Sequence, residues 1–260
     1  MATQFVTARD GTRIAYDTTG SGPLLLLLHG FGRDRRMWHD AGHVAALSAA
    51  YTVAPVDLRG HGESDRPTEA SAYAAEQLID DLHAVADALG ADQFRYWGYS
   101  YGATLGVQVA AHSPRVTRAV LAGSYFGSQR DEQWLRQGIA QTEMVIGAIE
   151  HKQLDALGLS DQERATITTF SPYVARACLL GIASFPDVRP ADARCPVLVY
   201  SGTQDHALPA IEAQRTALEA ARIPVEVFDG LTHPQLVTAR ETVLPVVRAF
   251  LEGAEGAQDA

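Results

Sequence analysis

Short apolar runs alternate with longer amphipathic segments along most of this chain. The runs "PLLLLLHG" and "YTVAPVDLRGHG" are almost continuously apolar before their glycine turns, a pattern typical of strands buried on both faces of a parallel sheet. Between such runs, apolar residues recur at the spacing of one helix face, as at Leu78, Leu82 and Val85, and residues 37–50 can form another helix. The alternation predicts an α/β fold built from β-α-β units.

The N-terminal pattern is different. In "QFVTARDGTRIAYDTTG", two segments of alternating polarity flank Asp10 and Gly11, a pair that favours a two-residue hairpin turn. We therefore expect an antiparallel edge before the parallel strands.

A helical insertion interrupts the strands between residues 125 and 190. It contains "DEQWLRQGIAQTEMVIGAIEHKQLDALG" and "YVARACLLGIASF", and between them Ser160 and Glu163 have the spacing of a capping box. The strand pattern resumes with "CPVLVYSGTQD" and "PVEVFDG", separated by a helix over about 211–221. This arrangement predicts a core domain of residues 1–124 and 191–260, with 125–190 as a separate helical unit.

Composition narrows the class of protein. Of the 260 residues, 47% are hydrophobic and 20% are charged, which is ordinary for a globular protein. The formal net charge is −10 and the basic residues are scattered, so nucleic acid is not an expected partner. No apolar run is long enough to span a bilayer, and the first residues lack the pattern of a signal peptide. We expect a cytoplasmic protein that does not bind membranes.

The cysteines do not suggest chemistry. Cys178 and Cys195 lack the spacing of metal ligands, so we expect two buried thiols and neither a disulfide framework nor a metal site. Almost all basic residues are arginine, which suggests a GC-rich bacterial genome.

One serine stands where a strand is expected to pass into a helix. In "YWGYSYGA", Ser100 lies between Gly98 and Gly102, after an apolar run and before a helical segment. A serine on such a sharp turn projects its hydroxyl above the sheet edge, and the flanking glycines let the strand and helix approach closely. Ser100 is therefore a candidate nucleophile, although a serine that only caps the following helix fits the same letters.

A nucleophilic serine needs a histidine to accept its proton and a carboxylate to orient that histidine. Asp205 ends the strand "VLVYSGTQD", and His233 follows the next strand, in "DGLTHPQ". The chain order Ser100, Asp205, His233 is the order that this strand–turn–helix architecture uses. Asp229 also ends a strand, but it precedes a glycine and is better explained as a turn residue.

Over residues 5–252 the sequence resembles the α/β-hydrolase fold family, in particular its small cap-bearing serine esterases. The matching motifs are "HGFG" at 29–32, "DLRGHGES" at 57–64, "GYSYG" at 98–102, "SGTQD" ending at Asp205, and His233 before a last helix. The resemblance implies a mostly parallel eight-stranded sheet flanked by helices, with the insertion as a helical cap. It also implies that His29 and His61 support loops.

An oxyanion hole is expected beside the serine. One donor is the backbone amide of Tyr101, which begins the helix after Ser100, and the resemblance implies the amide of Phe31 as the other. For substrate contacts we expect the side chains of Phe31, Tyr101, Tyr125, Trp134 and Met144.

These residues predict a carboxylesterase that forms an acyl-enzyme on Ser100, acts on a small-molecule ester and water, and needs no cofactor. It would be a monomer or a homodimer. Lactone opening, thioester hydrolysis, acyl transfer, perhydrolysis and carbon–carbon hydrolysis use the same residues and stay open. Epoxide hydrolases of the family carry an aspartate where this chain has Ser100. A ligand-binding module with slow turnover is the alternative from another class.

Two other polar clusters do not require a catalytic or metal-binding role. The charges of "GRDRR" at 32–36 predict a solvated loop near the mouth of the site, which could instead favour an anionic substrate. His39 and His43 have the i, i+4 spacing of a zinc-binding helix, but Gly42 interrupts that helix and a third ligand is missing. Zinc is therefore not expected there.

Overall fold

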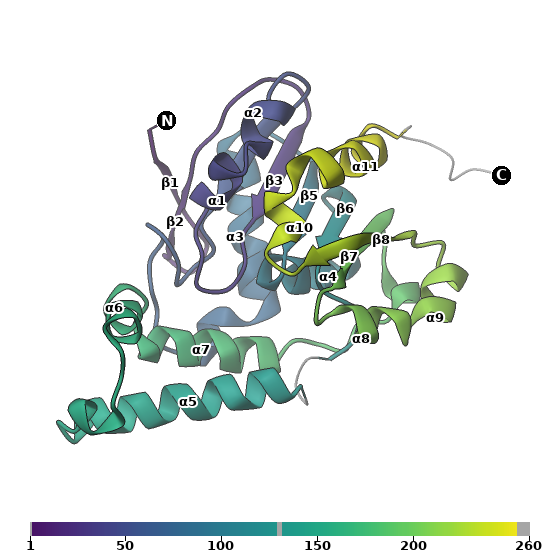
Figure 1. The fold of residues 1–260 in the computed structure, drawn as a ribbon. Coiled ribbons are helices and arrows are strands. Elements are labelled where there is room, and N and C mark those ends of the chain that lie inside the picture. Colours follow the sequence, from purple (N-terminus) through teal and green to yellow (C-terminus); the bar gives the residue numbers. More distant parts are fainter. Residues whose placement is uncertain (1, 129–131, 254–260) are drawn as a thin grey trace.

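The computed structural model describes residues 2–128 and 132–253. Its sheet has eight strands in the order β1-β2-β4-β3-β5-β6-β7-β8, with only β1–β2 and β2–β4 antiparallel, as expected (Figure 1). The strands are β1 (Gln4–Thr7), β2 (Arg13–Tyr16), β3 (Leu24–Leu28), β4 (Thr52–Val56), β5 (Phe94–Tyr99), β6 (Val116–Ala122), β7 (Val197–Gln204) and β8 (Val225–Thr232). The α/β fold class and the eight-stranded sheet are confirmed.

The continuous apolar strands are buried on both faces. In β3, Leu24, Leu26 and Leu28 join one hydrophobic cluster while Leu25 and Leu27 join the other, because successive side chains of a strand point to opposite faces. The first face is covered by α3 (Ala75–Ala88), α4 (Tyr101–His112), α8 (Leu208–Glu212) and α9 (Arg215–Ala220). The second is covered by α1 (Arg36–Asp40), α2 (His43–Leu47), α10 (Gln235–Thr238) and α11 (Arg240–Glu252).

Three local predictions need correction. The helix expected over 37–50 is divided into α1 and α2 because Gly42 adopts a left-handed conformation, with φ 75°. The helix expected over 211–221 is likewise two short helices, α8 and α9. The hairpin turn at Asp10 and Gly11 is longer than two residues, since Thr7 pairs with Arg13 across it.

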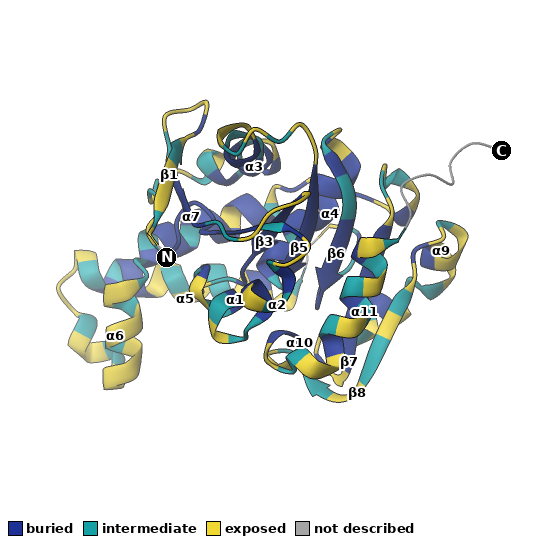
Figure 2. Ribbon diagram, turned by 90° about the horizontal axis from the view of Figure 1, so that it is seen from above, coloured by how far each residue is buried: buried dark blue, intermediate teal, exposed yellow. Residues whose placement is uncertain are grey.

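The chain between β6 and β7 is helical, as expected. It contains α5 (Gln133–Glu150), α6 (Asp161–Thr169) and α7 (Pro172–Ala183), with short 3-10 turns η2 (Leu154–Leu157) and η3 (Pro190–Asp192). The capping box of Ser160 and Glu163 is confirmed at the start of α6. Helix α7 packs on η1 (Ala70–Tyr73) through Tyr73 and Cys178, whereas α6 has no buried residue and lies at the edge of the molecule (Figure 2).

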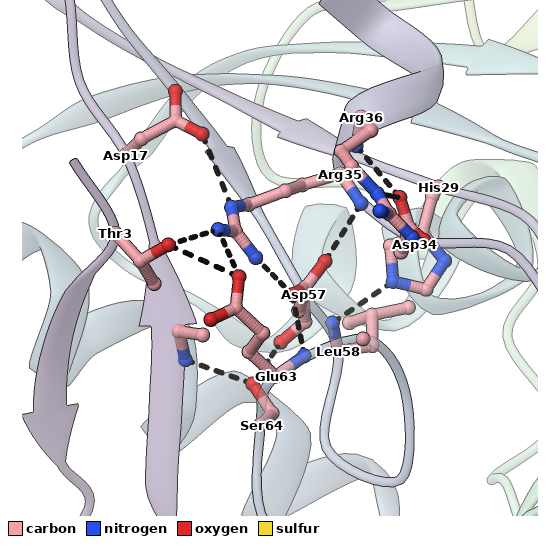
Figure 3. A network of polar contacts seen from close by, with 12 residues as sticks. Thr3, Asp17, His29, Asp34, Arg35, Arg36, Asp57, Leu58, Glu63 and Ser64 are labelled. Atoms are coloured by element: carbon pink, nitrogen blue, oxygen red, sulfur yellow. Dashed lines mark hydrogen bonds and ion pairs between the residues drawn. The ribbon is translucent and has the colours of Figure 1, made fainter. Parts of the chain in front are cut away.

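A buried ion network joins the loops that follow β3 and β4 (Figure 3). Arg35 donates to both carboxylate oxygens of Asp57, to Asp17 at 3.1 Å and to Glu63 at 2.7 Å. Only 6% of Arg35 is exposed, so the expectation of a wholly solvated "GRDRR" loop is wrong at this residue. Because a buried charge is stable only when it is paired, this network fixes the loop that also carries Phe31.

Within the described ranges, no helix is both long enough and apolar enough to cross a lipid bilayer.

Candidate active site

Ser100 occupies a strained turn between β5 and α4. Its backbone has φ 52° and ψ −112°, a conformation that residues other than glycine rarely adopt. A Cβ atom on Gly98 would lie 2.3 Å from the carbonyl oxygen of Gly102, and one on Gly102 would lie 2.5 Å from that of Leu28. The two glycines therefore permit the close strand–helix approach that raises the Ser100 hydroxyl above the sheet edge.

The structure brings Ser100, His233 and Asp205 together in a hydrogen-bonded line. His233 Nε2 lies 2.9 Å from Ser100 Oγ, and His233 Nδ1 lies 2.8 Å from Asp205 Oδ1. An ionised carboxylate only accepts hydrogen bonds, so Nδ1 carries the proton and Nε2 is left to accept one from Ser100. This geometry suits proton transfer from the serine hydroxyl to the imidazole.

The carboxylate of Asp205 is held on both oxygens. Ser201 Oγ donates to Oδ2 at 2.8 Å, and the Ala207 amide donates to Oδ1 at 3.1 Å beside the contact with His233. Burial acts to raise the pKa of Asp205, but the hydrogen bonds from His233, Ala207 and Ser201 outweigh burial and leave that pKa below its usual value. Asp205 is therefore ionised at neutral pH.

Phe31 and Tyr101, the expected oxyanion donors, line the same cavity as Ser100. The amides of Phe31 and Tyr101 donate no hydrogen bond to any other atom in the described part of the chain. The loop of Phe31 is held from several sides: His29 Nδ1 donates to the carbonyl of Gly30 at 2.8 Å, and the Gly102 amide donates to the carbonyl of His29 at 3.0 Å. His29 Nε2 also accepts from the Leu58 amide at 3.0 Å, so this histidine supports loops.

A cavity of about 300 Å³ opens over Ser100. Its lining residues include four that sequence analysis proposed as substrate contacts: Phe31, Tyr101, Tyr125 and Trp134. Met144 does not line it. Residue 144 lies on the outer side of α5 with 54% of its surface exposed, while the next residue, Val145, is buried. The proposed contact at Met144 is therefore not supported, because the phase of the helix turns this side chain away.

Some lining residues were not foreseen. Thr104 Oγ1 and Ser124 Oγ lie 2.9 Å apart in the cavity wall, and Ile182 reaches it from α7. Thr104 is one helical turn after Ser100 and therefore points to the same side. The spacing of four residues could have predicted its place in the cavity wall. Ser124 and Ile182 had no such signal.

His206, which follows Asp205 in the chain, is a further neighbour of the site. Its side chain is 70% exposed. It also lines the cavity, and its ring centroid lies 4.3 Å from that of His233. Burial is the larger cause, and proximity to His233 the second, of a pKa for His206 below the usual value.

The rejected alternatives lie apart from the serine. Asp229 accepts a hydrogen bond from Thr203 Oγ1 at 3.2 Å and is within β8. His39 contacts Asp17, and His43 contacts the carbonyl of Val237, so these two histidines do not form a common metal site. Cys178 and Cys195 are both free thiols.

Known proteins of one fold are similar to this chain. A family model described as "alpha/beta hydrolase fold" matches residues 23–147. A hydrolase from Pseudomonas aeruginosa PA01 superposes with a TM-score of 0.74 and 25% identity, over 97% of this chain and 98% of that one. The enol-lactonase from Burkholderia xenovorans LB400 gives a TM-score of 0.72 and 26% identity, over 95% and 99%. The family model and these solved structures show that the chain has the α/β-hydrolase fold.

Curated relatives match a shorter part. Bifunctional epoxide hydrolase 2 of Mus musculus is 32% identical over 117 residues, which are 45% of this chain and 21% of that protein. The uncharacterised hydrolase YraK of Bacillus subtilis (strain 168) is 33% identical over 112 residues, or 43% and 40% of the two chains. The chain thus matches less than half the length of each of these two relatives.

Proposed function

We propose that this protein is a serine hydrolase that cleaves carboxylic esters through an acyl-enzyme. The observation that carries the proposal is the line from Ser100 Oγ through His233 to Asp205, with contacts of 2.9 Å and 2.8 Å. Ser100 attacks the ester carbonyl, His233 takes its proton and returns it to the leaving alcohol, and Asp205 orients the ring and stabilises its cation. Water, activated by the same histidine, then releases the acid.

The unpaired amides of Phe31 and Tyr101 support this chemistry. During attack the carbonyl oxygen becomes negatively charged, and two donors fixed beside it stabilise that charge without having to reorganise. Removal of a single such donor costs about 10²–10³-fold in kcat in well-studied enzymes. The start of α4 at Tyr101 adds the positive end of the helix dipole at the same place.

Ser100 favours acyl substrates over epoxides. If a serine hydroxyl opened an epoxide, the product would be an ether on the enzyme, and neither water nor His233 could cleave it. Attack on an ester instead gives an acyl-enzyme, which water does cleave. The similarity to epoxide hydrolases in sequence therefore does not carry their reaction to this chain.

The cavity favours small to medium substrates. Its volume of about 300 Å³ lies at the lower end of typical ligand sites, and its wall combines aromatic side chains with the hydroxyls of Thr104 and Ser124. Lactone opening is the second candidate, supported by the 26% identity to an enol-lactonase along most of both chains. Thioesters, acyl transfer, perhydrolysis and carbon–carbon hydrolysis need the same three residues.

We also propose a domain organisation, a cellular location and partners for this protein. Residues 1–124 and 191–260 would form the catalytic core, and 125–190 would form a cap that supplies Trp134 and Ile182 to the cavity. Residues 1, 129–131 and 254–260 of these ranges lie outside the described part. We place the protein in the cytoplasm of a bacterium, as a monomer or homodimer that acts on a small ester and water without a cofactor, and without binding nucleic acid or membrane.

Hydrolysis of a p-nitrophenyl ester tests the proposal. Wild-type protein should show a burst of nitrophenol followed by steady turnover, and Ser100→Ala should show neither. Ser71→Ala, a change at an exposed serine of η1, is the matched control and should behave as wild type. A folded wild-type protein without burst or turnover on esters, lactones or thioesters would instead favour the ligand-binding module.

A further inference from the structure

Three potential metal ligands meet beside Ser100. Asp205, His206 and His233 each present one ligand atom, and these atoms lie within 4.8 Å of one another. Asp205 Oδ1 is 2.8 Å from His233 Nδ1 and 3.4 Å from His206 Nδ1. Two imidazoles and one carboxylate around a single point are the ligand types of catalytic zinc sites.

Two of the three spacings between these atoms are close to those in a tetrahedral zinc site. Zinc–nitrogen and zinc–oxygen bonds of about 2.0–2.1 Å place neighbouring ligand atoms about 3.3 Å apart. The contacts of 2.8 Å and 3.4 Å bracket that separation. Asp205 is moreover held by Ser201 and Ala207, so one ligand is already oriented before a cation arrives.

The cluster is open to solvent on one side. The His206 side chain is 70% exposed, that of His233 is 17% exposed, and that of Asp205 is fully buried. A cation could therefore reach the cluster past His206 while Asp205 lies at its base. The net charge of −10 favours the approach of cations in general.

We propose that Asp205, His206 and His233 form an inhibitory site for a divalent cation of the zinc class, with water as the fourth ligand. Binding needs the lone pair of His233 Nδ1, so the single ring proton moves from Nδ1 to Nε2 and the imidazole stays neutral. The reaction consumes no oxidant or other reactant. This site is distinct from a cofactor site, because its occupation opposes the reaction proposed for Ser100.

Inhibition follows from the shared ligands. A neutral ring that carries a divalent cation on Nδ1 has its proton on Nε2, so this nitrogen cannot accept the proton of Ser100. The carboxylate of Asp205 is also neutralised by the metal and no longer stabilises a histidine cation. Ser100 then lacks its base although its own position is unchanged.

Calorimetric titration of zinc chloride into the Ser100→Ala variant tests the site independently of any activity. This variant keeps all three ligands, so we expect one zinc ion per chain with a dissociation constant in the micromolar range. If no zinc binds at millimolar concentration, the proposal is wrong even if the protein is an esterase. If zinc binds but the protein proves not to be a hydrolase, the metal site stands and the proposed function fails.

Paired histidine variants locate the ion. His206→Gln removes one ligand and should weaken zinc binding by about tenfold or more. His151→Gln removes an exposed histidine at the end of α5 and should leave the affinity unchanged. Equal affinity in wild type and His206→Gln would place the ion elsewhere and overturn the proposal.

Inhibition is then measured on active protein. Zinc should slow ester hydrolysis by wild type at the concentrations at which it binds, and a chelator should restore the rate. In His206→Gln the ratio of uninhibited to inhibited rate at a fixed zinc concentration should fall towards one. Zinc that binds at the cluster without slowing hydrolysis would contradict the inhibitory role.

Discussion

Two buried aspartates occupy equivalent places in this fold and have different partners. Asp57 directly follows β4 and Asp205 directly follows β7, at the same edge of the sheet. Asp57 accepts hydrogen bonds from Arg35 and from the Glu63 amide, so both its oxygens pair with groups that never lose their protons (Figure 3). Asp205 instead hydrogen-bonds to His233, whose other ring nitrogen lies 2.9 Å from Ser100 Oγ.

The difference shows that a buried carboxylate at a strand end does not by itself indicate catalysis. Arginine keeps its charge at any working pH, so Asp57 and Arg35 can only hold two loops together. A histidine that shares its second nitrogen with a serine can move a proton. The partner of the carboxylate, rather than its burial or its position, separates a structural pair from a catalytic one.

The largest expected effect is on activity at Asp205. Asp205→Asn removes the charge that orients and stabilises the His233 cation, so kcat for ester hydrolysis should fall about 10⁴-fold while the protein stays folded. Asp229→Asn is the matched control on the neighbouring strand β8 and should change kcat little. Steady-state kinetics with circular dichroism measure both properties. A large loss in Asp229→Asn with little change in Asp205→Asn would reverse the assignment of the acid.

The next effect is on stability at Asp57. Asp57→Asn leaves the buried guanidinium of Arg35 without its main partner, and the free energy of unfolding should fall by about 3 kcal/mol. The folded fraction should lose much less kcat than Asp205→Asn does, since Asp57 has no contact with Ser100 or His233 and acts only through the loop that carries Phe31. Urea denaturation and kinetics on the same sample separate the two outcomes. Unchanged stability with a loss of kcat like that of Asp205→Asn would remove the distinction between the aspartates.

A smaller effect concerns histidines that are buried for structural reasons. Burial lowers the pKa of His43 to about 4 and that of His61 to about 3. Below pH 6.5 the unfolded chain binds protons that these folded histidines do not, so the free energy of unfolding should fall as the pH falls from about 6.5 to about 4. Each such group contributes up to about 1.4 kcal/mol per pH unit.

His43→Phe tests this slope. His43 packs against the rings of Trp38 and Trp97, so phenylalanine fills a similar space without a titrating group. Urea denaturation between neutral pH and pH 5 should show a shallower loss of stability than in wild type. If stability falls equally steeply with pH in His43→Phe and in wild type, then His43 takes up its proton as readily in the folded protein as in the unfolded chain.

The sequence predicted the parts of the site that follow strand ends. Ser100 and Asp205 are predicted at the ends of strands and His233 in the loop after the next strand, and parallel strands bring such positions to one edge. The burial of Arg35 was missed, since its charged neighbours indicated a solvated loop and its acidic partners are distant in sequence. The side chain of Met144 was misplaced because helical spacing alone does not say which face of α5 meets the core. The adjacency of His206 to Asp205 does not reveal the orientation of its ring.

The central claim is that Ser100 is the nucleophile. Treatment with a fluorophosphonate, followed by mass spectrometry of the digested protein, tests it directly. The reagent should modify one residue per chain, located on Ser100, and Ser100→Ala should remain unlabelled although it is folded. Labelling at another residue, or equal labelling of the folded Ser100→Ala variant, would contradict the claim.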